Sequence, residues 1–203
     1  MSDQLTVWNR LRAGNEAFFV PIRSKPGSTP ATGPIAAVFR CADAGLASEV
    51  VFGQSWGSLV DISTWGHVVD AGVLATMEYA VDTLEVPLIV VLGHDNCPAM
   101  RVALRAWTEA AIPDGSARTM VEQAVSSIVR RAARTDSIET VTSAHVVETG
   151  LSLLERSPVI ARRVDEGSCG IICATTDANH GWVRTCATIG VVSEDAESLL
   201  ERV

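Results

Sequence analysis

The stretch VPLIVVLGHDNCPAM, residues 86–100, carries the strongest structural signal in the chain. Its first half is an apolar run, rich in β-branched residues, that ends at Gly93, and such a run predicts a buried strand. Pro98 suits the first position of a following helix, because the missing N–H of proline is not needed there. His94 and Cys97 therefore lie between a strand and a helix, at the kind of strand end where open α/β sheets bind ligands.

Strands and helices are predicted to alternate along the rest of the chain. Apolar runs predict further buried strands over IAAVFRC (35–41) and GSCGIICATT (167–176), the second of which is followed by a hairpin. Apolar residues at helical spacing predict the remaining helices, over residues 71–84, 117–134 and 138–156. This alternation is typical of an α/β domain with a small, mainly parallel β-sheet flanked by helices.

The N-terminal part of the chain is predicted to form a helical arm. Residues 1–23 contain an amphipathic helix, with Trp8 and Leu11 on its apolar side. A linker loop rich in Pro, Gly, Ser and Thr follows at residues 24–34. At 203 residues, the whole chain 1–203 fits a single domain that includes this arm.

The composition argues against several classes of partner. A net charge of −8 at pH 7 disfavours nucleic acids and anionic membranes, because both attract a basic face. The N-terminal residues lack the apolar run of a secretory signal, and no segment has the roughly 20 uninterrupted apolar residues of a membrane span. We therefore expect a cytoplasmic protein. Its five cysteines should be reduced there, which favours metal binding or catalysis over disulfides.

The stretch FRCADAG, residues 39–45, places Cys41 at the end of a predicted strand. If this strand lies beside the strand that ends at His94, then Cys41, His94 and Cys97 meet at one edge of a parallel sheet. Two thiolates and one imidazole supply three ligands of the tetrahedral set that zinc prefers. The pattern alone fits simple burial equally well, because cysteine is among the residues most often found in protein cores.

Four stretches taken together resemble the β-class carbonic anhydrases: CADAGLASEVVF, WGHVVDAGVLATMEYAV, VPLIVVLGHDNCPAM and HVVETGLSLLERSPVI. The similarity runs from LRAGNEAF almost to the C-terminus. It implies a β-carbonic-anhydrase-like fold that assembles as a homodimer or homotetramer. It also implies a Zn²⁺ cofactor held by Cys41, His94 and Cys97, with Asp43 as the adjacent catalytic carboxylate.

The chain departs from this family around the implied site. The family pairs the aspartate, here Asp43, with an arginine two residues later that keeps the carboxylate off the metal; here that position is Gly45. Ser63 and Trp65 stand where a second family motif has arginine and alanine. Pro98 replaces a glycine after the second cysteine. Several changes around one pocket indicate an altered function.

Three of the changed residues, together with the nearby His67, define a predicted substrate pocket. His67 either shuttles protons or makes a structural hydrogen bond. Arg101, four residues beyond Cys97, is a better candidate replacement for the missing cation than Arg40, which strand alternation directs to the opposite face from Cys41. The pocket residues are Gly45, Ser63, Trp65 and His67.

Two functions fit these residues. The first is a zinc lyase or hydrolase of the carbonate dehydratase type, which uses zinc-bound hydroxide to hydrate or hydrolyse a small electrophilic carbon such as CO2, COS or CS2. Efficient CO2 hydration is not expected without the arginine. The alternative is a catalytically inactive zinc-binding homologue, in which Asp43 closes the metal site and the fold serves binding or assembly.

The C-terminal hairpin holds a second group of metal-binding residue types. It comprises Cys169, Cys173, His180 and Cys186. Burial of the cysteines in a hydrophobic hairpin is the favoured interpretation over a second zinc site.

Overall fold

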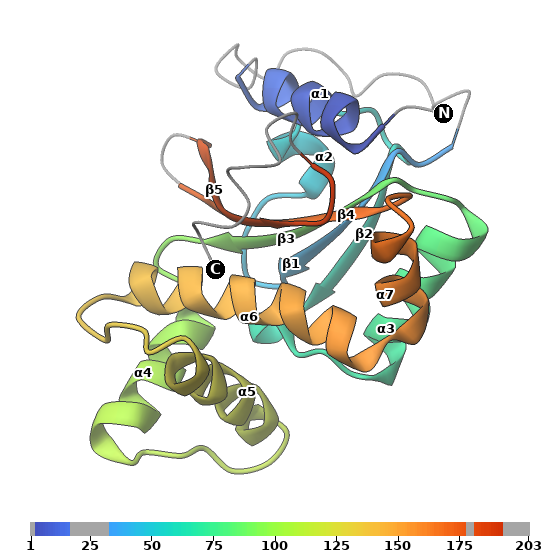
Figure 1. Ribbon diagram of the computed structural model, residues 1–203. Helices are drawn as coiled ribbons and strands as arrows, with labels where there is room; N and C mark the ends of the chain where they lie inside the picture. Colours follow the sequence, from blue (N-terminus) through green and yellow to red (C-terminus); the bar gives the residue numbers. More distant parts are fainter. Residues whose placement is uncertain (1–2, 17–32, 178–180, 193–203) are drawn as a thin grey trace.

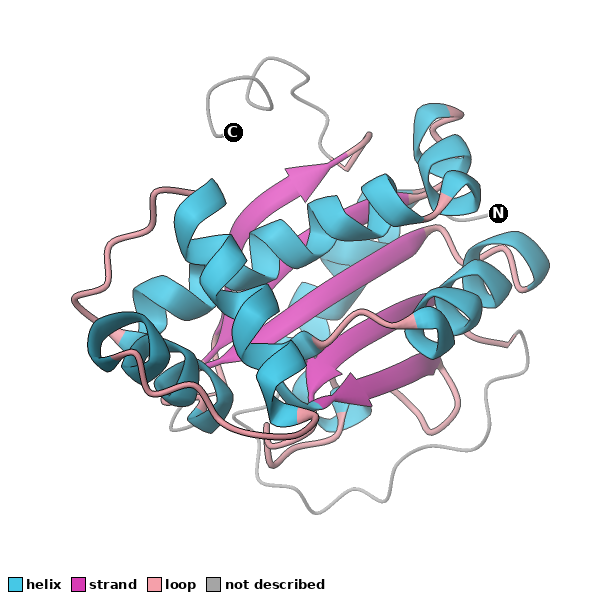
Figure 2. Cartoon of the chain, turned by 90° about the horizontal axis from the view of Figure 1, so that it is seen from below, coloured by secondary structure: helices cyan, strands magenta, loops and turns pink. Residues whose placement is uncertain are grey.

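The computed structural model describes residues 3–16, 33–177 and 181–192 of the chain. They form a five-stranded sheet in the order β2-β1-β3-β4-β5, with helices on both faces (Figures 1 and 2). The strands are β1 (Ala36–Cys41), β2 (Leu59–Thr64), β3 (Leu88–His94), β4 (Gly170–Thr176) and β5 (Val183–Ile189). The first four pair in parallel and β5 is antiparallel to β4. The predicted α/β fold with a small, mainly parallel sheet is confirmed.

The helices lie close to where helical spacing predicts them. Residues 138–156 form one helix, as predicted, and the helix expected from Pro98 begins there. The prediction lacks β2 and the short helices α2 and α7. The helices are α1 (Gln4–Glu16), α2 (Ser48–Val51), α3 (Ala71–Glu78), α4 (Pro98–Glu109), α5 (Ala117–Arg130), α6 (Ile138–Arg156) and α7 (Pro158–Asp165), with short helical turns η2 (Trp65–His67) and η3 (Tyr79–Thr83).

The central strands are buried on both faces. Every residue of β3 and β4 is buried, which explains why both read as nearly continuous apolar runs. Because side chains alternate along a strand, Val38 and Val90 pack beneath α1 and α2, whereas Phe39 and Val91 pack beneath α3, α6 and α7.

The pair α4 and α5 lies beyond one end of the sheet (Figure 1). Its apolar side chains form a third cluster, which includes Met100 and Met120. Cys41 and Cys97 belong to the same cluster and are fully or almost fully buried. The helices α4 and α5 therefore cover the carboxyl ends of β1 and β3 and shield them from solvent.

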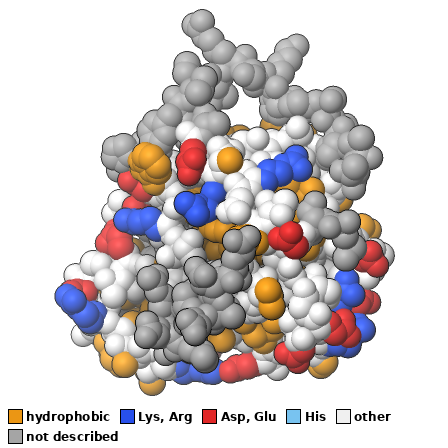
Figure 3. All heavy atoms as spheres, turned by 45° about the horizontal axis from the view of Figure 1, so that its top comes forward, with side chains coloured by type: hydrophobic (Ala, Val, Ile, Leu, Met, Phe, Trp, Pro, Cys, Tyr) orange, Lys and Arg blue, Asp and Glu red, His pale blue; other side chains and the backbone are white. Residues whose placement is uncertain are grey.

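The surface carries charges of both signs. Acidic and basic side chains are interspersed on the face shown in Figure 3. Within the described ranges, no helix has both the length and the apolar character needed to cross a membrane. An N-terminal helix is present as α1, which buries Trp8 and Leu11, while residues 17–23 and most of the predicted linker 24–34 fall outside the described ranges.

A close backbone contact joins α1 to the end of α2. A Cβ atom on Gly14 would collide with the carbonyl group of Phe52, and a Cβ on Gly53 would lie 2.8 Å from the carbonyl oxygen of Gly14. Glycine within a helix lowers helix stability by about 1 kcal/mol relative to alanine. The close contact with the backbone of Phe52 explains why glycine nevertheless stands at position 14.

We predict that Gly14→Ala destabilises the protein by about 1–3 kcal/mol in urea unfolding, because the added methyl group forces the two backbones apart. Gly72→Ala is the matched control, since a Cβ there meets only a side-chain oxygen of Asp70 at 3.3 Å. A Gly14→Ala protein as stable as the Gly72→Ala protein would show that the contact is not tight.

Candidate metal centre

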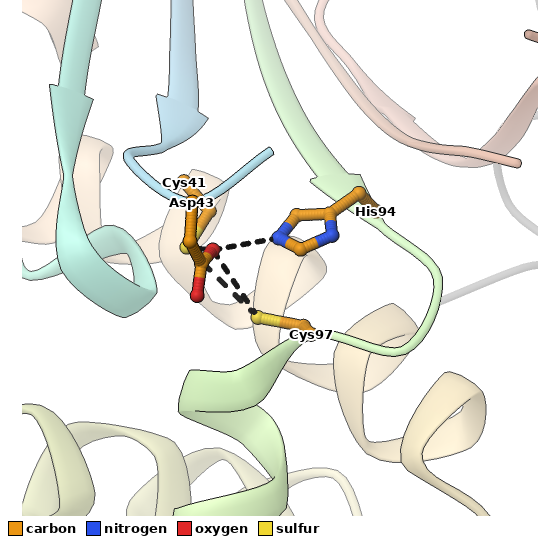
Figure 4. Close-up of side chains that lie close together, drawn as sticks. All are labelled: Cys41, Asp43, His94 and Cys97. Carbon is orange, nitrogen blue, oxygen red and sulfur yellow. Dashed lines mark hydrogen bonds and ion pairs between the residues drawn. The ribbon is translucent and has the colours of Figure 1, made fainter. Parts of the chain in front are cut away.

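The parallel pairing of β1 with β3 brings the predicted metal ligands together. Cys41 is the last residue of β1 and His94 the last of β3, and the two strands are neighbours. Cys97 immediately precedes α4, and Asp43 lies in the turn after β1. Figure 4 shows all four side chains directed at one another. The juxtaposition follows from strand order, as the sequence suggested.

The distances within this group suit metal binding. The Sγ atoms of Cys41 and Cys97 are 3.9 Å apart, and Oδ1 of Asp43 lies 2.8 Å from Nε2 of His94 and 2.7 Å from Sγ of Cys41. One ligand atom from each of Cys41, Asp43, His94 and Cys97 lies within 4.8 Å of the others, so the group can hold a metal ion. We call these four residues the metal cluster.

The donor set fits zinc. Zinc–sulfur bonds of about 2.3 Å at a tetrahedral angle separate two sulfurs by about 3.8 Å, close to the observed Sγ–Sγ distance. The Nδ1 atom of His94 lies 3.1 Å from the backbone carbonyl of Asp95, to which it can donate its hydrogen. Such an outer hydrogen bond leaves the Nε2 lone pair facing the metal position.

The two thiols of the metal cluster differ in acidity. The hydrogen bond to Cys97, reinforced by burial, raises the pKa of Cys41 above its usual value. The same hydrogen bond, received from Cys41, lowers the pKa of Cys97, and the backbone N–H groups of Met100 and Ala99 at the start of α4 lower it further. A helix N-terminus thus favours the thiolate at Cys97.

The carboxylate and the imidazole stabilise each other as an ion pair. Burial opposes ionisation of Asp43, but hydrogen bonds from Cys41, His94 and Trp65 outweigh it and lower the pKa of the carboxyl group. Burial likewise opposes protonation of His94, but hydrogen bonds to Cys41 and Asp43 raise its pKa to about 9. A metal ion that binds His94 must therefore displace a proton.

The turn η2 supplies two further hydrogen-bond donors. The backbone N–H of Gly66 donates to Sγ of Cys41 over 3.1 Å, and the indole Nε1–H of Trp65 donates to Oδ2 of Asp43 over 3.2 Å. Trp65 is thus the one predicted pocket residue with a hydrogen bond to the metal cluster among the described side chains. Gly45 is exposed in the turn after β1, and Ser63 is exposed on β2 opposite Arg40.

His67 is buried and makes a structural hydrogen bond. Its Nε2 atom lies 3.0 Å from the carbonyl oxygen of Leu92, and its side chain is 2% exposed. Burial, with the nearby His145 ring, lowers the pKa of His67 to about 3. Of the two roles open from the sequence, this environment favours the hydrogen bond, because a proton shuttle must be able to take up a proton.

His145 also helps to hold the turn η2, although nothing in the sequence distinguishes it from other residues of its helix. Its Nε2 atom lies 2.9 Å from the carbonyl oxygen of Gly66, and its Nδ1 atom lies 2.8 Å from Oγ of Ser127. Burial lowers the pKa of His145, so the ring is neutral. The neutral ring can donate from Nε2 and accept at Nδ1, which fixes the turn that contacts Cys41.

Neither arginine considered from the sequence reaches Asp43. The Nε atom of Arg40 lies 3.0 Å from Oδ2 of Asp61, on the face opposite Cys41 as strand alternation requires. Arg101 is exposed on α4. Among the described residues, the hydrogen-bond partners of Asp43 are Trp65 and the rest of the metal cluster.

The remaining cysteines form no metal site in the described part of the chain. Cys169 and Cys173 are fully buried, and burial raises the pKa of each thiol to about 12. The metal cluster is the one group of metal-binding side chains within reach of one another in these ranges. His180 lies outside them.

A polar cavity of about 360 Å³ lies between α5 and α6 rather than at the metal cluster. Ser127, His145 and Glu148 line it, together with Arg130 and Arg156. None of the four metal-cluster residues borders it, so this cavity is not the place where a substrate would meet the metal.

Comparisons with known proteins agree on one family. The sequence profile of the family described as carbonic anhydrase matches residues 36–183. Carbonic anhydrase 2 of Mycobacterium tuberculosis is 36% identical over an alignment of 206 positions, which covers 96% of this chain and 98% of the relative.

Solved structures share the fold. A Coccomyxa β-carbonic anhydrase in complex with acetazolamide matches with a TM-score of 0.68 at 21% identity, over 96% of this chain and 87% of that one. One of two tetrameric β-carbonic anhydrases from Sordaria macrospora matches with a TM-score of 0.62 at 22% identity, over 76% and 81% of the two chains.

We predict that His67 makes the metal-free protein sensitive to acid. The unfolded chain takes up a proton on His67 near pH 6.5, whereas the folded protein resists protonation until about pH 3. The contribution of His67 to the free energy of unfolding is therefore fully present above pH 6.5 and is lost as the pH falls from 6.5 towards 3. In His67→Gln, urea unfolding should depend less on pH between 6.5 and 3. Parallel stability curves for the two proteins would contradict this reading of His67.

Proposed function

Because this chain belongs to the β-class carbonic anhydrases, and is thus an enzyme of the carbonic anhydrase type, we propose that it binds zinc through Cys41, His94 and Cys97. We propose CO2 as its substrate, or a related electrophilic carbon such as COS or CS2. The observation that carries this proposal is the metal cluster itself: two thiols, an imidazole and a carboxylate meet where two parallel strands end.

Each side chain of the metal cluster has a role in this proposal. Zinc bound there would act as a Lewis acid and make hydroxide available from water near pH 7. Cys41 and Cys97 supply the negative charge that holds the cation, and His94 supplies a neutral nitrogen. Asp43, which is kept ionised by its hydrogen bonds, can accept a hydrogen bond from the attacking water and orient it.

One observation favours a second candidate function. Oδ1 of Asp43 lies among the ligand atoms of Cys41 and His94, and Gly45 provides no cation to draw it outwards. A carboxylate that stays there occupies the place that water needs. The protein would then be a zinc-binding homologue without hydrase activity.

The assembly proposed from the sequence is a homodimer or homotetramer. The Sordaria macrospora structures that share this fold are described as tetrameric, which supports a multi-subunit assembly. A cytoplasmic location stays a prediction from composition.

We predict that the purified protein retains zinc in a roughly 1:1 ratio after dialysis and accelerates CO2 hydration in a stopped-flow indicator assay. Cys97→Ser should lose the zinc and the acceleration together, because serine is a poor zinc ligand. Cys186→Ser, which removes a cysteine outside the metal cluster, should keep both. Zinc-loaded wild-type protein with no more activity than Cys97→Ser would favour the second candidate. Equal zinc content in all three proteins would refute the ligand assignment.

We also predict that Gly45→Arg raises kcat/KM for CO2 hydration by about tenfold, within the range that outer partners of metal ligands contribute. No atom lies within 4 Å of a Cβ placed at Gly45, so an arginine has room to pair with Asp43. The backbone φ of +73° strains any side chain at this position, and Gly45→Gln controls for that strain. Equal rates for the two variants would show that the missing cation does not limit activity.

A further inference from the structure

The Asp43 carboxylate divides its contacts between its two oxygens. Oδ1 faces His94 at 2.8 Å and Cys41 at 2.7 Å, and it also lies 4.0 Å from Sγ of Cys97. Oδ2 accepts the indole Nε1–H of Trp65 at 3.2 Å, and no other described side chain is hydrogen-bonded to it. The orientation of the carboxylate therefore depends on Trp65 from one side and on the ligand atoms from the other.

Two arginine side chains near the metal cluster are paired with other carboxylates. Arg40 pairs with Asp61 at 3.0 Å, and Arg184 pairs with Asp95 at 2.8 Å. The cation that relatives of this family place two residues after the aspartate is replaced by Gly45, around which the space is open. The indole N–H of Trp65 is thus the described donor on the outer oxygen, Oδ2, and it brings no positive charge to that oxygen.

The indole is held in place by the turn that carries it. Gly66 and His67 both have positive φ angles, of 65° and 56°, which turn the chain sharply after Trp65. The Gly66 carbonyl accepts a hydrogen bond from His145, and the Gly66 N–H donates to Cys41. A Cβ on Gly66 would collide with the side chain of Met120, so the turn packs closely against α5 at this point. The Trp65 ring itself packs against the apolar cluster under α4 and α5.

We propose that Trp65 is a positioning residue, which holds Oδ2 of Asp43 with its indole N–H and so turns Oδ1 towards the metal ligands. This inference rests on the proposed metal-binding function. An indole N–H donates a single hydrogen bond and cannot accept one, so it fixes one oxygen and leaves the other directed at Cys41 and His94. A charged arginine, by contrast, binds both oxygens of a carboxylate and draws the group towards itself.

The contact can be tested without metal or activity. In zinc-free protein, the indole N–H of Trp65 should exchange with solvent about tenfold faster in Asp43→Ala than in wild type, because a hydrogen bond to a charged acceptor is lost. The measurement is ¹H–¹⁵N NMR of the tryptophan side chains. The indole of Trp56, whose side chain is 50% exposed, is the internal control and should not change. Equal exchange of the Trp65 indole in both proteins would overturn the proposal.

The consequence for the metal is tested with two replacements of Trp65. Trp65→Phe keeps an aromatic ring and removes the N–H, whereas Trp65→Gln keeps an N–H donor and removes the ring. With Co²⁺ as the probe metal in place of zinc, Trp65→Phe should lower the affinity by about tenfold and change the visible absorption of the bound ion. Trp65→Gln and the control Trp56→Phe should resemble wild type. A Trp65→Phe protein that matches wild type, or a Trp65→Gln protein that is equally impaired, would contradict positioning through the N–H.

The measurements distinguish a failure of the metal-binding function from a failure of the positioning role of Trp65. If wild-type protein bound no cobalt, the metal-binding function would be wrong, yet the exchange measurement would still decide whether Trp65 holds Asp43. If cobalt bound normally and the Trp65 indole exchanged freely, the metal function would stand and the positioning role would not.

Discussion

The site depends on one constraint, which is the parallel pairing of β1 with β3. Parallel neighbours end at the same edge of a sheet, so the last residues of these strands, Cys41 and His94, must lie together. The turn into α4 then adds Cys97 at a helix N-terminus, where the backbone favours a thiolate. The three proposed metal ligands are thereby positioned by the most buried part of the fold, and α4 and α5 shield them from solvent.

Asp43 is the part of the site that this constraint leaves free. It lies in a turn, half-buried, between the ligand atoms and the indole of Trp65. In a pocket with an arginine at position 45, charge would draw the carboxylate outwards. Here the nearest substitute is a neutral N–H on its outer oxygen, and the inner oxygen remains beside Cys41 and His94. On the outer side, the carboxylate is therefore held by one neutral hydrogen bond rather than by a charged partner.

Much of this arrangement was predictable because it follows from local patterns. The β-branched run before Gly93 and the proline after Cys97 define β3 and α4, and the resemblance to a known family predicts the ligands. The strand β2 was missed because it lies at the edge of the sheet and exposes Asp61 and Ser63, so its sequence has no continuous apolar run. The helix α7 was missed because it begins at Pro158, directly after α6 ends, so helical spacing does not separate the two.

The contact between Trp65 and Asp43 could not be predicted, because the residues are 22 positions apart and meet only through a turn with two positive φ angles. The most direct test of the whole account is a crystal structure of the zinc-loaded protein with anomalous data at the zinc edge. We predict one zinc bonded to Sγ of Cys41, Sγ of Cys97 and Nε2 of His94, with Trp65 still hydrogen-bonded to Asp43. Zinc bound at other residues, or no zinc at these three, would contradict the account.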